Sequence, residues 1–533
     1  MRRRTFLLGA GAGVLASCGK FAGAPSQSGG GGSVVIGWKL DEISSLDPVD
    51  AFERSSTEIC RNIYNTLLIY DTGDTSVIKG LAAQSWTVDP DGRRYVFKLR
   101  PGMKFHSGRP VTSKDFLYSI VRAVELDRAP TYMLADIGIN RTTVSTCVQT
   151  PDASTIVIEL PEPRAQQLVL CTLTTNVTAI VDSEEVKAHV SGSDFGNDWL
   201  KRHSAGSGPF RLTVWQPNQS VILDRYDGYW RGAAKSSRIL LRHLPEPSTQ
   251  QLLLQKGDID IARNLNPSQT AAVVESPSFE TQSGDTFRID YICLNAAYGP
   301  FQKEGVLEAL KYLIDYDGLV ATILKGFAVT RQSFVPLGIP GAVKDAPYTL
   351  DVNRAKQLLR DAGYADGFDL AVDVRGSSPD IDIAQALQAS FAKAAVRLTI
   401  NSEDYKQMLT KYRARRHQMV IANWGSDYPD PHAMAGAFAS NPDNSDDAVL
   451  KTVAWRASWN IPQMTRDVAA AARELDAARR KGMYEEIQRE HMKSAPIIEV
   501  FQEKQVIVKR KGVDGLLLAP SSYPDTYLNL RKT

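Results

Sequence analysis

The sequence predicts a mixed α/β fold, and three observations support this prediction. Segments with the patterns of strands and helices alternate from about residue 350 to residue 425, which favours a parallel or mixed sheet covered by helices. The chain has 533 residues, enough for two or three domains of roughly 150 residues each. Its hydrophobic content of 43% and charged content of 23% are ordinary for a soluble globular protein.

Apolar spacing and helix-ending residues place the individual elements. Clusters of β-branched and aromatic residues predict strands at 34–38, 95–99, 221–223, 370–374, 419–422 and 496–501. Apolar residues at helical spacing predict helices at 57–68, 353–362, 381–395, 405–415 and 466–492. A further helix begins at Thr112, which can cap the first turn, and Asp115 lies in that turn. Gly363 is a typical left-handed stop for the helix before it.

The charges of the chain are almost balanced. It has 62 basic and 60 acidic residues, and three of the arginines lie among the first four residues. The remaining surface therefore has no bulk attraction to nucleic acid or anionic lipid, and we expect no nucleic-acid partner. No later segment is long and apolar enough to span a membrane, which takes roughly 20 residues.

The first residues have the pattern of an export signal. Arg2, Arg3 and Arg4 precede the short apolar run from Phe6 to Val14, and small residues follow. Leu15-Ala16-Ser17-Cys18 resembles the lipobox of bacterial lipoproteins, in which the cysteine is lipidated and becomes the new N-terminus. An ordinary cleaved signal with an incidental cysteine is the alternative. The arginines also partly resemble a twin-arginine signal, so the export route stays open.

These features predict how the N-terminal segment is organised. We expect a signal peptide at 1–17 and lipid attachment at Cys18, which would be the only membrane anchor. A Gly/Ser-rich linker at 18–33 has no side chains that build a core and behaves as flexible coil. The mature protein would then lie on the extracytoplasmic face of the cell membrane, in the periplasm or at the cell surface.

Four cysteines follow Cys18, and in an exported chain they can pair as disulfides. They are Cys60, Cys147, Cys171 and Cys293. They allow three disulfide connectivities, of which we favour Cys147 with Cys171. Cys293 lies in an apolar run and equally fits a buried free thiol. No CxxC spacing occurs, so the sequence supports no zinc ribbon or thioredoxin-like site.

Several motifs occur in an order that resembles one protein family. They are Leu46-Asp47-Pro48, residues 81–86, Asp91-Gly92, residues 95–112, residues 206–210, Tyr226-Asp227-Gly228-Tyr229-Trp230, Gly257-Asp258-Ile259-Asp260, residues 309–317 and residues 355–364. The chain is similar, from about residue 35 to its C-terminus, to the family 5 extracellular solute-binding proteins, which serve peptide and nickel importers. Ordered agreement of this length is far more specific than any single motif.

The resemblance implies a fold and a function. The fold would be a two-lobed clamp of the periplasmic-binding-protein type, with an extra subdomain in lobe one. Lobe one would comprise 34–290 and 501–533, and lobe two 291–500. The protein would be a monomeric, lipid-anchored receptor that binds peptides between the lobes and delivers them to an ABC permease. We expect no enzymatic activity, no cofactor and no metal.

The segment after the strand at 419–422 is the strongest candidate for ligand contact. The carboxyl ends of strands are where α/β proteins bind ligands. Trp424 offers a flat apolar wall, Gly425 admits close backbone approach, and Asp427 offers a negative charge. In peptide-binding relatives, the aspartate at the place of Asp427 holds the α-amino group of the peptide. The alternative is that Asp427 only caps its own turn by accepting backbone hydrogen bonds.

Arg375 follows the strand at 370–374 and is the second candidate. A guanidinium can bind a carboxylate through two parallel hydrogen bonds. In dipeptide-binding relatives an arginine at this place holds the C-terminus of the peptide. Those relatives have an aromatic residue where this chain has Ser377, which we also expect to contact the ligand. Oligopeptide binders have an arginine where this chain has Ile421. The length of the peptide is therefore open, and an exposed arginine in a surface ion pair is the alternative for Arg375.

Two further alternatives concern the solute and the chemistry. The same fold can hold a non-peptide solute such as a nickel chelate, a sugar or an amino-acid conjugate, and an exported hydrolase on another α/β fold is the third hypothesis. Asp427, Asp430 and His432 have the side-chain types of metal ligands, but prolines interrupt them and a turn explains them equally well. The sequence contains no GxSxG, HExxH or Walker A motif.

Overall fold

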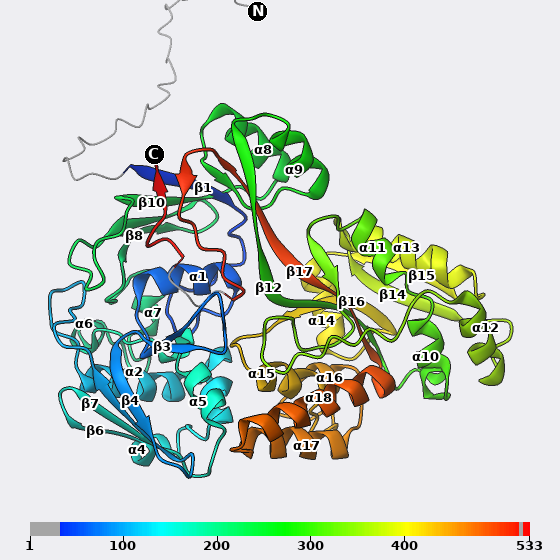
Figure 1. Cartoon of the computed structure of the whole chain (residues 1–533), viewed down its shortest axis with the longest axis horizontal. Helices are drawn as coiled ribbons and strands as arrows, with labels where there is room; N and C mark the ends of the chain where they lie inside the picture. Colours follow the sequence, from blue (N-terminus) through cyan, green and yellow to red (C-terminus); the bar gives the residue numbers. More distant parts are fainter. Residues whose placement is uncertain (1–31, 522–525) are drawn as a thin grey trace, which may run out of the picture. The chain divides into compact units, whose positions relative to one another are not determined.

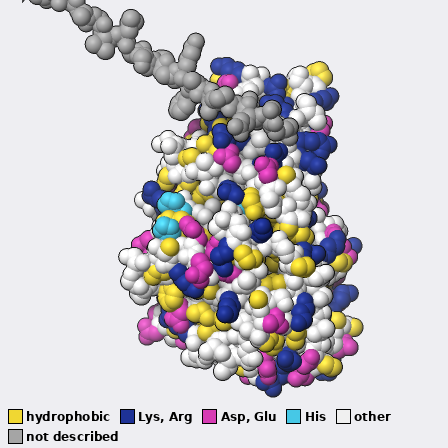
Figure 2. All heavy atoms as spheres, turned by 90° about the vertical axis from the view of Figure 1, so that its left-hand side faces the viewer, with side chains coloured by type: hydrophobic (Ala, Val, Ile, Leu, Met, Phe, Trp, Pro, Cys, Tyr) yellow, Lys and Arg dark blue, Asp and Glu magenta, His cyan; other side chains and the backbone are white. Residues whose placement is uncertain are grey.

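The computed structural model describes residues 32–521 and 526–533. The expected signal peptide, the lipid attachment at Cys18 and most of the linker lie outside the described residues. Within the described ranges, no helix combines the length and the apolar character needed to cross a bilayer. On the face that Figure 2 draws, basic and acidic side chains are interspersed over most of the surface, and basic side chains are more frequent near its upper end.

A mixed sheet organises the described part of the chain. Its strands are β1 Ser33–Trp38, β8 Phe210–Gln216, β9 Ser220–Arg225, β10 Arg238–His243, β11 Ile261–Ala262, β12 Phe279–Leu294, β13 Ala328–Thr330, β14 Asp369–Arg375, β15 Arg397–Glu403, β16 Met419–Gly425 and β17 Ile497–Arg510. Within the described ranges these eleven strands follow the order β15-β14-β16-β12-β17-β11-β1-β10-β9-β8, and β13 pairs with β17.

The long strands β12 and β17 connect the two ends of this sheet. They pair antiparallel from Phe279 with Arg510 to Cys293 with Ile497, and the register shifts between Asp285 and Ile289. Figure 1 shows them side by side between β1 and β10 on one side and β14 and β16 on the other. The expected lobe boundaries at residues 290 and 500 fall within these two strands. The boundaries themselves stay a prediction.

Residues between β1 and β8 build a separate sheet with its own core. The elements of this segment are α1 Arg54–Ile63, β2 Leu68–Tyr70, β3 Ile78–Gly80, β4 Ala83–Val88, β5 Arg94–Leu99, α2 Ser113–Leu126, α3 Tyr132–Asp136, α4 Val144–Cys147, β6 Val148–Asp152, β7 Thr155–Glu159, α5 Gln166–Thr172, α6 Ser183–Lys187 and α7 Asn197–Leu200. Strands β4-β5-β7-β6 form the sheet. Phe97, Phe116 and Leu168 are buried in its core, and Tyr428 and Ala472 of the later chain belong to the same cluster.

The remaining elements cover the large sheet. They are α8 Pro247–Lys256, α9 Pro267–Val274, α10 Val306–Lys311, α11 Tyr316–Thr322, α12 Val352–Asp361, α13 Asp380–Ala392, α14 Tyr405–Arg413, α15 Pro431–Phe438, α16 Val453–Arg456, α17 Pro462–Arg473, α18 Ala477–Ser494, and the short strands β18 Val513–Asp514 and β19 Arg531–Lys532. Strand β14 runs parallel to both β15 and β16. The carboxyl ends of these three strands, at Arg375, Glu403 and Gly425, therefore lie at one edge of the sheet.

Three expected features differ in the structure. The single helix expected over 466–492 is wrong, because α17 ends at Arg473 and the Asp476 carboxylate caps a new helix by accepting from the Arg479 amide at 2.7 Å. Helix α1 ends at Ile63 because Tyr64 is already extended. Strand β16 continues beyond the expected residue 422 to Gly425, which places Trp424 opposite Ile289 of β12.

The disulfide expected between Cys147 and Cys171 is also wrong. All four cysteines of the described part of the chain are free and buried. The Cys171 thiol instead faces the Pro429 carbonyl oxygen at 3.7 Å. Burial raises the pKa of Cys171 well above its usual value, so this thiol stays protonated and unreactive.

Candidate binding site

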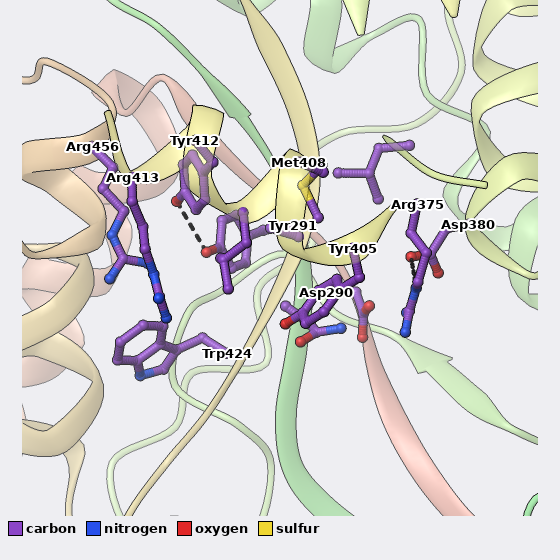
Figure 3. A pocket seen from close by; sticks show the side chains of 14 residues that line it. Asp290, Tyr291, Arg375, Asp380, Tyr405, Met408, Tyr412, Arg413, Trp424 and Arg456 are labelled. Carbon is purple, nitrogen blue, oxygen red and sulfur yellow. Dashed lines mark hydrogen bonds and ion pairs between the residues drawn. The ribbon is translucent and has the colours of Figure 1, made fainter. Parts of the chain in front are cut away.

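A cavity of about 130 Å³ lies at the carboxyl edge of β14 and β16. Its lining comes from β12, β14, β16, α13, α14 and the end of α16 (Figure 3). The lining residues are Asp290, Tyr291, Arg375, Asp380, Tyr405, Met408, Leu409, Tyr412, Arg413, Ile421, Ala422, Asn423, Trp424 and Arg456. Both Arg375 and Trp424, which the sequence singles out from different strands, therefore meet in one cavity.

Arg375 lies at one end of this lining and is held by its neighbours. Its Nε donates to Asp380 Oδ2 at 2.9 Å, and its guanidinium lies 5.3 Å from the centroid of the Tyr405 ring. The Arg375 side chain keeps 35% of its surface exposed. Burial alone would lower its pKa, but the charge of Asp380 and the hydrogen bond to it raise the pKa above its usual value. Arg375 thus takes part in an ion pair, as the alternative proposed, and it also lines the cavity.

Trp424 forms part of the other end of the lining, together with two arginines. The half-buried Trp424 ring packs against the apolar core around Tyr291 and Phe438. The Arg456 guanidinium lies 5.3 Å from the Trp424 ring centroid and 5.3 Å from that of Tyr412. Figure 3 shows Arg413 and Arg456 both pointing towards the Trp424 ring. This end of the cavity is cationic and aromatic.

A group of opposite charges lies beside the cavity on β12 and β17, in which Asp290 is buried and Arg288 and Glu503 are half-buried. Arg288 Nε lies 3.2 Å from Glu503 Oε1, and the Arg288 NH2 group donates to Asn423 Oδ1 at 2.6 Å. Burial, followed by the charge of Glu503, raises the pKa of Asp290 well above its usual value. Both effects favour the neutral form of the Asp290 carboxyl, which lines the cavity.

Asp427 is half-buried and does not line the cavity. Its carboxylate accepts a hydrogen bond from the hydroxyl of Tyr132, which belongs to α3. No backbone amide of the described residues donates to the Asp427 carboxylate, so turn capping does not explain this side chain. Burial raises the pKa of Asp427 to about 6, although the Tyr132 hydrogen bond opposes that rise. Asp427 therefore joins two segments that are distant in sequence.

Neighbouring residues of the same turn have structural partners. Asp430 accepts from both terminal nitrogens of Arg480 at 2.7 and 2.8 Å, and its carboxylate caps α15. His432 Nδ1 lies 3.0 Å from the Tyr484 hydroxyl. Within the described ranges no three acidic, histidine or cysteine side chains are grouped in a way that would hold a metal ion. The polar groups of this turn thus stabilise the fold.

Gly425 and Ser377 are exposed, and neither lines the cavity. A Cβ on Gly425 would meet only the Phe287 carbonyl oxygen, at 3.9 Å, so the packing there does not demand glycine. The Ser377 carbonyl oxygen accepts from the Ile381 amide at 3.3 Å, just before the first full turn of α13. Their expected contact with a ligand stays a prediction.

Several lining residues are not among those that the sequence singles out. Four of them lie on α14: Tyr405, Met408, Tyr412 and Arg413. The sequence pattern predicts this helix, but it does not predict how the helix is oriented. Apolar spacing on that helix would have identified the face of Met408 and Tyr412 that turns to the core. No sequence signal indicates Arg456, which reaches the cavity from a helix more than thirty residues after Trp424.

Comparison with known proteins identifies relatives over nearly the whole chain. Residues 77–446 match the bacterial extracellular solute-binding proteins, family 5 Middle. The glutathione-binding protein GsiB of Salmonella typhimurium is 27% identical over 489 residues, which cover 90% of this chain and 91% of GsiB.

Solved structures show the same fold. The periplasmic binding protein DppA from Helicobacter pylori, in complex with the peptide STSA, aligns with a TM-score of 0.79 at 25% identity, covering 94% of this chain and 98% of DppA. The substrate-binding protein CtaP from Listeria monocytogenes aligns with a TM-score of 0.82 at 18% identity, covering 95% and 100%. These alignments confirm the expected two-lobed α/β fold.

Proposed function

Because the chain belongs to the bacterial extracellular solute-binding proteins of family 5, we propose that it is a receptor that binds peptides and delivers them to an ABC permease. It is a monomer anchored outside the cytoplasmic membrane by a lipid on Cys18, and it hydrolyses nothing. The peptide lies between lobe one, residues 34–290 and 501–533, and lobe two, residues 291–500. The peptide bound by DppA and the tripeptide glutathione named for GsiB support a peptide ligand.

One observation carries this proposal. The carboxyl edge of β14 and β16 places a cationic Arg375 in a cavity, while the turn directly after β16 presents the carboxylate of Asp427. A peptide is a zwitterion, so a cation for its carboxylate and an anion for its ammonium are the groups that it needs. In our proposal Arg375 binds the C-terminus and Asp427 binds the α-amino group, with Trp424 as the apolar wall between them.

The amine role of Asp427 can be tested by titration calorimetry with a free-amine peptide and its N-acetyl analogue. We expect Asp427→Asn to weaken binding of the free-amine peptide by about 2–5 kcal/mol, because the ammonium would lose its buried partner. Binding of the N-acetyl analogue should change far less. Asp447→Asn is the matched control, since Asp447 is exposed. Equal losses for both peptides would remove the amine role.

The role of Arg375 is tested in the same way with a C-amidated peptide. Arg375→Ala should weaken binding of the free-acid peptide and largely spare the amidated one, because only the first carries a carboxylate. A uniform loss would instead assign Arg375 to the structure of the β14–α13 turn. Native mass spectrometry of the purified protein would identify any retained ligand, and the mass of a non-peptide solute would contradict the peptide proposal.

A further inference from the structure

Arg413 and Arg456 differ from the other arginines of the candidate site because they have no acidic partner. Arg375 pairs with Asp380 and Arg288 pairs with Glu503. Across the part of the chain that the structure describes, neither Arg413 nor Arg456 has a carboxylate within ion-pair distance. Both nevertheless line the cavity. Two arginines without an ion-pair partner therefore border one small space, Arg456 half-buried and Arg413 with its outer part exposed.

Two aromatic rings hold the Arg456 guanidinium in place, but its Nε donor has no hydrogen-bond partner among the described residues. Its guanidinium lies between the rings of Tyr412 and Trp424, at 5.3 Å from each centroid. The Nε atom of Arg456 is buried and has no hydrogen-bond partner among residues 32–521 and 526–533. A buried donor without a partner costs free energy that a bound acceptor would recover.

Arg413 adds a second positive charge beside Arg456, which further favours an anion there. Arg413 extends from the end of α14 towards Trp424, on the side of the ring from which Arg456 also approaches in the view of Figure 3. Burial and the charge of Arg456 both lower the pKa of Arg413, as expected for two like charges close together. An anion placed between the two guanidinium groups would relieve this repulsion.

Arg415 shows what an arginine with a purely structural role looks like in this chain. Its guanidinium also stacks on a tryptophan, 3.6 Å from the Trp455 ring centroid. Its nitrogens donate to the Trp455 carbonyl oxygen at 2.6 Å and to the carbonyl oxygen of Asn444 at 2.9 Å. It also lies 3.5 Å from the Asp446 carboxylate. Stacking on an aromatic ring therefore does not by itself leave an arginine without partners.

We propose that Arg413 and Arg456 form a subsite for a second carboxylate of the solute, seated on the face of Trp424. This inference rests on the proposed peptide-binding function and narrows it to peptides that carry an acidic side chain or branch. Arg375, at the other end of the cavity lining, takes the terminal carboxylate. A carboxylate fits because its two oxygens match the planar donors of a guanidinium.

The experiment compares peptides that differ only by a carboxylate and an amide. Trialanine is substituted at each of its three positions by Glu or by Gln, and each peptide is titrated by calorimetry. For the wild-type protein we expect Glu to bind at least tenfold more tightly than Gln at one of the positions. Arg413→Gln and Arg456→Gln should each reduce that Glu-to-Gln ratio to near one.

Controls separate the subsite from general effects. Arg416→Gln removes a positive charge three positions after Arg413, from an exposed side chain that does not line the cavity, and the ratio should keep its wild-type value. Arg456→Lys, which keeps the charge, should retain part of the preference. Equal binding of Glu and Gln peptides by the wild type would overturn the subsite. Failure of every peptide to bind would overturn the peptide receptor itself.

Discussion

Asp427 already holds a partner from within the protein. Its carboxylate accepts from Tyr132, and burial raises its pKa to about 6. A carboxylate has about four acceptor positions, so one hydroxyl does not saturate it. An incoming ammonium can bind alongside Tyr132 and would favour the ionised form of Asp427. The protonation of this one group should therefore control how tightly a free amine binds.

The affinity for a free-amine peptide should depend on pH through Asp427. The carboxyl gains a proton as pH falls through about 6, and the protonated form cannot attract the ammonium. Between about pH 7.5 and about pH 5 we expect the affinity to fall by roughly tenfold, because only about a tenth of the Asp427 carboxyl groups are ionised at the lower pH. Calorimetry across this range measures the effect. Asp427→Asn should flatten the profile. An unchanged slope in this variant would assign the pH dependence to another group, such as Asp136, whose pKa burial raises to about 7.

The raised pKa of Asp427 affects stability in the opposite direction: binding weakens as pH falls, whereas the contribution to stability is lost as pH rises. Between its ordinary value and about 6, the folded state holds a proton on Asp427 that the unfolded chain releases. Asp427 therefore contributes to stability below its ordinary pKa, and that contribution is lost as pH rises through about 6. Binding and stability thus make opposite demands on one carboxyl group, as is common at functional sites.

Residues that follow strands could be found from the sequence, but their contacts could not. Arg375 and Trp424 lie at the carboxyl ends of β14 and β16, and strand patterns predict both positions. The Tyr132 hydroxyl reaches Asp427 across 295 positions of the chain. Local patterns contain no information on such a pairing, because it depends on how α3 packs against the turn after β16.

At the scale of elements, Arg480 of α18 fixes the turn that follows β16. Its guanidinium binds both oxygens of the buried Asp430, which also caps α15. Burial alone would raise the pKa of Asp430, but the charge of Arg480 and its hydrogen bonds lower it. The ion pair therefore holds α15, α18 and the Asp427 turn together.

Arg480→Ala should destabilise the protein by about 3–5 kcal/mol, because it leaves the Asp430 carboxylate buried without its partner. Urea denaturation measures the loss. The neighbouring Arg479 is the matched control: its side chain is 77% exposed and pairs with Glu474 at 3.1 Å. Arg479→Ala should cost about 0–1 kcal/mol, as for surface ion pairs. Similar losses for both variants would show that the Asp430 pair contributes no more than a surface ion pair.

The elements also show where sequence patterns fail. The alternation of strands and helices predicts β14, α13, α14 and β16 closely, because each has its own apolar periodicity, but β15 was missed. The break between α17 and α18 was missed because apolar and charged residues continue at helical spacing through it. There α17 ends at Arg473, and Asp476 caps the start of α18. The full length of β12 was also missed, since its outer half is too polar to indicate a strand.

At the scale of the whole molecule, the Asp427 turn links segments on both sides of β12. Tyr132 donates to Asp427, and the Ala165 amide donates to the Ala472 carbonyl oxygen at 3.1 Å. Tyr428 and Ala472 are buried in the same cluster as Phe97 and Leu168. Binding proteins of this fold respond to ligand by hinge motion between lobes. Contacts of this kind help set the equilibrium between their conformations.

Tyr132→Phe tests this link in the ligand-free protein. A hydrogen bond to a charged group contributes about 1.5–3 kcal/mol, so its loss should shift the equilibrium towards conformations in which the two segments are apart. Small-angle X-ray scattering should show a larger radius of gyration for the variant without peptide. A saturating free-amine peptide should restore the wild-type value, because the ligand then joins the segments. Tyr118→Phe is the control, since the Tyr118 hydroxyl is buried without a partner among the described residues. An unchanged radius in Tyr132→Phe, with and without peptide, would show that this hydrogen bond does not govern the opening.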